Sequence, residues 1–155
     1  MDVANVGNKG TLDLLLDKNT MPGFNDSGAH ITNMAFFDAN LTSLKLAQQK
    51  SLETVATMVR RLTREPAQFF GLDVGTLELG DQADIVMIDP EALRNWDDSS
   101  NRKLIYRDLF EHQQMVSRSD GVVTHTLING QVVWREGDFG EALGKQTLGR
   151  ALRAA

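Results

Sequence analysis

The feature that most constrains the fold of this chain is the pair Asn129-Gly130, which lies between two runs rich in strand-forming residues, 122–128 and 131–135. Asn-Gly is typical of a two-residue β-turn, because both central residues of that turn need positive φ angles. The pair therefore predicts an antiparallel hairpin. The nearly continuous apolar run 83–88, which lies between Gly80 and Pro90, has strand length and predicts a buried strand beside it.

The sequence before about residue 72 has helical patterns instead of strand patterns. Residues 11–17 and 65–71 predict short helices, and residues 41–62 predict a longer one that is interrupted near Ser51. Ser51 is a good N-cap for the second part of that helix. A basic cluster at its C-terminal end suits the helix dipole and is interpreted as a solvated helix end; its residues are Arg60, Arg61 and Arg64.

The helix after Ser51 carries apolar residues at helical spacing, which predicts one apolar stripe. The stripe consists of Leu52, Val55, Ala56, Val59 and Leu62. After residue 72, the mixed segment 91–119 predicts an insertion with one helix over residues 104–115, and the tail 144–155 predicts a short helix. The chain is thus expected to be of the α+β class, with helical residues 1–72 followed by a β module over residues 73–155.

Composition excludes several functions. The 155 residues include 16 Lys+Arg and 21 Asp+Glu, and a net charge of −5 argues against nucleic-acid binding. The chain has no cysteine, which excludes disulfides and thiolate chemistry and fits a reducing, cytoplasmic location. No apolar run approaches the length of a membrane span and no signal peptide is recognisable, so we expect no membrane partner. With three histidines in all, a polyhistidine metal site is hard to build.

The densest polar cluster outside obvious turns is residues 25–30, where Asp26 and His30 flank Gly28. A carboxylate and an imidazole at this spacing could face one site, since loops after strands carry the catalytic groups of α/β barrels. Asn-Asp-Ser-Gly is equally an ordinary turn composition. The residues by themselves leave both interpretations open.

Six segments, in this order, resemble the amidohydrolase superfamily, and most of all its branch of N-acyl-D-amino-acid deacylases (D-aminoacylases). They are the strand-eight signature at 23–30, the following helix at 62–72, the return into the β-sandwich at 75–89, the closing strands at 117–123 and 128–133, and the C-terminal sequence at 148–153. Together they cover nearly the whole chain.

The resemblance implies the last elements of a (β/α)₈ metal-dependent hydrolase barrel followed by a small β-sandwich module. It implies hydrolysis of non-peptide carbon–nitrogen bonds in an N-acyl amino acid or a related amide, with zinc as the cofactor. By position, Asp26 is the catalytic residue that takes a proton from metal-bound water and also touches the metal. His30, Ser27 and Gly28 are the substrate-binding residues that the resemblance implies.

A barrel of this type takes about 250 residues, and the H-x-H pair that carries the family's metal ligands is absent from this chain. We therefore expect a C-terminal portion that is inactive by itself, whose partner is the missing N-terminal barrel portion or another copy of the chain. The alternative is a non-catalytic β-sandwich and helix module for assembly or partner binding. Because no arginine occurs between His30 and Arg60, D-amino-acid specificity is not assigned.

Overall fold

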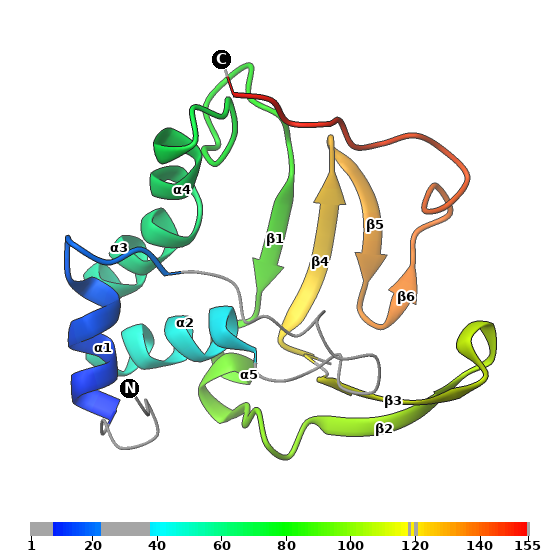
Figure 1. Ribbon diagram of the computed structural model, residues 1–155, viewed down its shortest axis with the longest axis horizontal. Helices are drawn as coiled ribbons and strands as arrows, with labels where there is room; N and C mark the ends of the chain where they lie inside the picture. Colours follow the sequence, from blue (N-terminus) through cyan, green and yellow to red (C-terminus); the bar gives the residue numbers. More distant parts are fainter. Residues whose placement is uncertain (1–7, 23–37, 118, 120, 155) are drawn as a thin grey trace.

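The computed structural model describes residues 8–22, 38–117, 119 and 121–154. Helices gather on one side and strands on the other, and the C-terminal tail crosses the end of the sheet (Figure 1). The helices that precede the first strand are α1 (Asn8–Leu16), α2 (Ala39–Lys50), α3 (Leu52–Leu62) and α4 (Arg64–Phe69). This order confirms that a helical segment precedes a β-rich one.

The interruption at Ser51 is confirmed. Ser51 ends α2 and begins α3, with its own backbone extended and its Oγ accepting a hydrogen bond from the Thr54 backbone N–H at 3.1 Å. The helix over 65–71 is also present as α4, which ends before Gly71 at a φ of +64°. Pro66 lies at the third position of α4, and not at the first as its sequence position indicates.

The core lies between the helices and the start of the sheet. It takes residues from α1, α2 and α3, from the short helix α5 (Pro90–Asn95) with the residue after it, and from the residue before β4. Its buried members are Leu12, Leu41, Leu44, Leu46, Ala47, Met58, Leu93, Trp96 and Val122. One core therefore includes side chains from both sides of residue 72.

The predicted apolar stripe of α3 is only partly covered. Val55 and Leu62 pack against the core, whereas Leu52 is 84% exposed and Val59 is 45% exposed. The buried positions of α3 are Thr54, Met58 and Arg61, so the buried face is rotated from the most apolar one.

The strands form two antiparallel sheets in the described part of the chain. The larger has the order β1 (Ile85–Ile88), β4 (Val123–Ile128), β5 (Gln131–Arg135) and β6 (Asp138–Phe139), and the smaller pairs β2 (Arg102–Arg107) with β3 (His112–Ser117). The Asn129-Gly130 hairpin is confirmed: it joins β4 to β5 with φ values of +50° and +76°.

Three sequence-based expectations are wrong. The run 83–88 forms β1 but is not buried: β1 is an edge strand whose Val86 and Met87 are each about half exposed. The helix expected over 104–115 is the β2–β3 hairpin, which a short 3₁₀ turn at Asp108–Phe110 closes. His112, which falls within the helix expected over 104–115, therefore lies on a strand.

The third concerns the tail: residues 144–154 form no helix. They return instead to the helical side, where the Arg150 guanidinium donates to the Asp73 carbonyl at 2.8 Å. Among the described helices, none is long and apolar enough to cross a membrane.

Candidate functional site

The residues that the sequence singles out for catalysis and binding are Asp26, Ser27, Gly28 and His30. All four lie outside the described residues, so the structure neither brings them together nor separates them. The chain on either side of residues 23–37 is described. Its contacts define how the described chain before and after this segment is held.

Arg61 holds the chain that precedes the segment. It comes from the last turn of α3, and its side chain is only 6% exposed. One terminal nitrogen, Nη2, donates to the carbonyl oxygens of Asp17 at 2.9 Å and Thr20 at 2.5 Å, while Nη1 lies 3.5 Å from a carboxylate oxygen of Glu65. The interpretation of Arg61 as part of a solvated helix end is therefore wrong.

Asp98 holds the chain that follows the segment. Its buried carboxylate accepts the backbone N–H of Asp38 at 3.0 Å through Oδ1, and pairs with the Arg102 guanidinium through Oδ2. Ser117 at the end of β3 adds a longer contact of 3.4 Å. Asp38 itself caps α2 by accepting from the Leu41 N–H at 3.0 Å. Asp98 thus ties the start of α2 to the β2–β3 hairpin.

A second acid next to it behaves differently. Asp97 is fully exposed, and hydrogen bonds from the Ser99 side chain and from Ser100 hold the pKa of its carboxyl below the ordinary value. The positive charge of the Lys45 ammonium, which donates to the carbonyl oxygen of Trp96, also lowers the pKa of Asp97. A carboxylate that is fully solvated and engaged with neighbouring serines is a turn-forming group.

The described residues include no group of three or more His, Cys, Asp or Glu side chains placed to hold a metal ion. His125 lies half-buried on β4, opposite Met87 and Arg135, and His112 contacts the Phe110 carbonyl at 2.9 Å through Nδ1.

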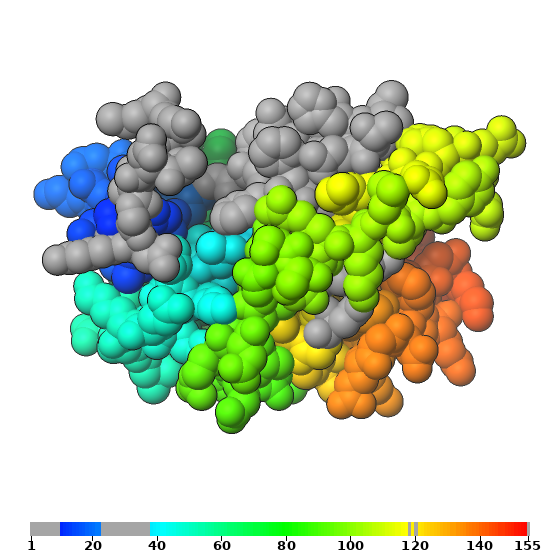
Figure 2. Space-filling view, turned by 90° about the horizontal axis from the view of Figure 1, so that it is seen from below, coloured from blue at the N-terminus to red at the C-terminus, as the bar shows by residue number. Residues whose placement is uncertain are grey.

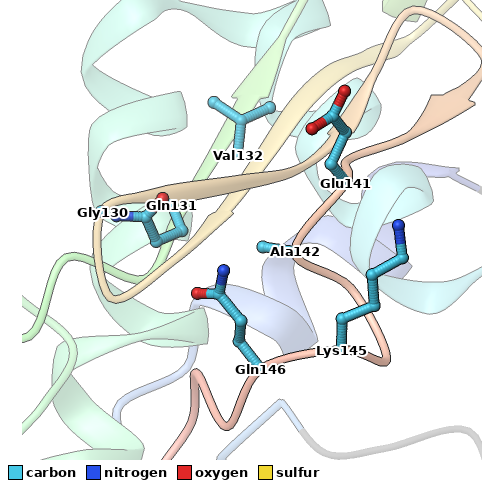
Figure 3. Close-up of a pocket in the computed structure, with 7 residues that line it drawn as sticks. All are labelled: Gly130, Gln131, Val132, Glu141, Ala142, Lys145 and Gln146. Carbon is cyan, nitrogen blue, oxygen red and sulfur yellow. The ribbon is translucent and has the colours of Figure 1, made fainter.

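A shallow cavity of about 540 Å³ lies between the β4–β5 turn and the tail. Figure 3 shows Gly130, Gln131 and Val132 on one side of it, and Glu141, Lys145 and Gln146 from the segment after β6 on the other. Its side chains include one carboxylate, one ammonium group and two amides, but no imidazole or hydroxyl group.

No sequence pattern singles out Asp98, and the basic cluster at the end of α3 does not indicate that Arg61 is buried. Each side chain bonds to a backbone group that is distant in the sequence. Arg61 bonds to Asp17, which is 44 residues away, and Asp98 bonds to Asp38, which is 60 residues away. The one sequence signal for Arg61 is its position at i+3 from Met58 on the buried face of α3.

The comparison with known families settles the class of protein. Residues 34–134 match the amidohydrolase family, and this match covers more than half of the chain. The chain therefore belongs to the amidohydrolase family.

Known relatives agree with this assignment. The chain is 39% identical over 125 residues to an uncharacterized protein of Mycobacterium tuberculosis. The match covers 76% of this chain and 20% of the relative. The chain is 33% identical over 101 residues to a dihydroorotase of Geotalea daltonii, or 59% of this chain and 20% of the enzyme. It thus spans about a fifth of the length of these relatives. No solved structure matches the chain.

Members of this family typically depend on a metal ion. The described residues of this chain do not fit such an ion, because they bring together no set of three candidate ligands. A hydrolytic zinc site normally has three protein ligands.

Proposed function

We propose that this chain is the C-terminal portion of a metal-dependent amidohydrolase that acts on carbon–nitrogen bonds other than peptide bonds. The observation that carries the proposal is the family match over residues 34–134. Residues 1–72 correspond in this proposal to the end of the barrel, and residues 73–155 to a β-sandwich module. The two antiparallel sheets of the second segment support this division.

Within the proposal, Asp26 is the catalytic carboxylate and the contact to the metal. Ser27, Gly28 and His30 bind the substrate. The chain before this segment is held by Arg61 and the chain after it by Asp98. Catalytic groups need such support from the surrounding structure. Asp26 and His30 supply at most two ligands for zinc, fewer than the usual three. The chain by itself is therefore inactive.

We propose two candidate substrate classes. The segments from 23–30 to 148–153 resemble N-acyl-D-amino-acid deacylases, which favours an N-acyl amino acid. Two relatives are dihydroorotases, from Geotalea daltonii and Clostridium acetobutylicum, which makes dihydroorotate the second candidate. We favour the N-acyl amino acid because the resemblance runs through six segments in order.

We expect the purified chain to show no turnover of N-acetyl amino acids or of dihydroorotate when Zn²⁺ or Co²⁺ is added. The measurement is product release, with Asp26→Asn as the test variant and Asp13→Asn, an exposed acid on α1, as its control. Turnover that Asp26→Asn abolishes and Asp13→Asn preserves would contradict the proposal that the chain is inactive alone. The same result would support the role of Asp26.

A second candidate function is partner binding, and the exposed apolar surface of α3, α4 and the residue after α4 favours it. Leu52 is 84% exposed, Val59 45%, Phe69 72% and Phe70 57%. Burying one such side chain is worth roughly 1.5–3 kcal/mol. The partner in this proposal is the N-terminal barrel portion, or another copy of the chain when that portion is absent.

We expect the isolated chain to self-associate at micromolar concentration through this surface. Sedimentation velocity should show a dimer or larger species for the natural sequence and a smaller species for Leu52→Ser combined with Val59→Ser. Leu109→Ser is the matched control, because Leu109 is 86% exposed at the distant β2–β3 turn. That hairpin extends to one edge of the molecule, away from α3 (Figure 2). A monomer at every concentration would contradict self-association.

A further inference from the structure

We propose that Asn129 is a deamidation site that the fold protects, so that its conversion reports opening of the β4–β5 turn. Asn129 is an exposed residue, and it is the only asparagine of the chain that a glycine follows. A following glycine leaves its own backbone nitrogen sterically accessible, because it has no Cβ. The pair thus combines an accessible amide with an unhindered neighbouring nitrogen.

The chemistry needs no reactant besides water. The Gly130 backbone nitrogen loses its proton and attacks Cγ of Asn129, the Cγ–Nδ2 bond breaks, and ammonia leaves with that proton. The resulting five-membered succinimide is opened by one water molecule at either carbonyl. The products are aspartate, or isoaspartate in which the main chain runs through the former side chain.

The folded turn opposes the first step in two ways. The attacking nitrogen is occupied, since the Gly130 N–H donates to the Ala83 carbonyl at 2.8 Å. The turn backbone is also fixed, with Asn129 in the left-handed region at φ +50° and its own N–H bonded to Asp84 Oδ1 at 2.8 Å. Reaction requires the Gly130 N–H to leave the Ala83 carbonyl and the Asn129 backbone to leave this fixed conformation, so the rate should follow local opening of the hairpin.

Conversion would change the sheet permanently. Isoaspartate adds one main-chain atom to a two-residue turn whose length fixes the register of β4 against β5. The turn also contacts the two residues that precede β1, Ala83 and Asp84. Loss of the turn geometry therefore loosens the β1–β4–β5 pairing.

The test compares the full chain in native buffer and in denaturant, at neutral pH and physiological temperature. Deamidation is followed by the mass change of the peptide that contains Asn129, with peptides of the other asparagines as internal controls. In the denatured chain, we expect Asn129 to react before the other asparagines. In the folded chain, we expect the reaction of Asn129 to be slower by a factor of about ten or more. Equal rates in both states, or an earlier reaction at another asparagine in denaturant, would overturn the proposal.

A variant tests the role of the turn contacts. Asp84→Ala removes the acceptor of the Asn129 N–H and should accelerate deamidation in native buffer, whereas Asp138→Ala, an exposed acid on β6, should not. Circular dichroism establishes whether the variant is folded. A folded Asp84→Ala variant with an unchanged rate would contradict control by turn opening. The comparison of folded and denatured natural chain decides the matter if the variant unfolds.

Discussion

Replacing Arg61 by methionine is expected to lower the free energy of unfolding by about 3 kcal/mol, a large part of the stability of a small domain. Methionine keeps much of the volume but provides no donor. The carbonyl oxygens of Asp17 and Thr20 then lose the guanidinium that holds them at 2.9 and 2.5 Å. Urea unfolding, followed by the fluorescence of the buried Trp96, measures the change.

Arg60→Met is the matched control. Arg60 is the neighbouring residue on α3, its side chain is 61% exposed, and it pairs with the same acid, Glu65, at 3.1 Å. A surface ion pair of this kind contributes about 0–1 kcal/mol. Equal losses for the two variants would contradict the anchoring role of Arg61 and would indicate a general effect of removing positive charge from α3.

Local chemistry explains what the sequence predicts well. The interruption of the helix at Ser51 follows from one side chain capping its own helix, a contact across three residues. The hairpin at Asn129-Gly130 follows from the φ angles that these two residues tolerate. In both cases the information lies within a few residues, and sequence reasoning reaches it directly.

The β2–β3 hairpin shows where sequence reasoning fails. Its strands carry Lys, Arg and Gln on exposed positions, and these residues suit a helix as well as an edge strand. What selects the strands is burial of one face, through Gln114 and Val116 of β3. Which face of a strand is buried depends on the rest of the fold, so a local pattern does not decide between strand and helix here.

The candidate site divides in the same way. Its proposed chemical groups, Asp26 and His30, are found by motif, because a motif is a local signal. Its anchors, Arg61 and Asp98, are found in the structure, because each bonds to backbone atoms more than 40 residues away. A basic cluster on a helix end does not reveal which of its members is buried.

Replacing Asp98 by alanine is the second large effect that we expect, also with a loss of about 3 kcal/mol in the free energy of unfolding. The substitution removes the acceptor of the Asp38 N–H at the start of α2 and leaves the Arg102 guanidinium without its buried partner. Urea unfolding by tryptophan fluorescence again gives the change. Amide hydrogen exchange at the start of α2 should accelerate in the variant, since the hydrogen bond that holds its N-cap residue Asp38 is lost.

Asp97→Ala is the matched control for Asp98, because Asp97 is adjacent in sequence but fully exposed. Its effect should be much smaller and should depend on pH. Hydrogen bonds from Ser99 and Ser100 lower the pKa of the folded carboxyl, so its contribution is complete above the ordinary pKa of aspartate. The contribution is lost as the pH falls through the lowered value. If Asp97→Ala at neutral pH lowers the free energy of unfolding as much as Asp98→Ala does, the contribution of Asp98 to stability does not come from its burial or from its contact to Asp38.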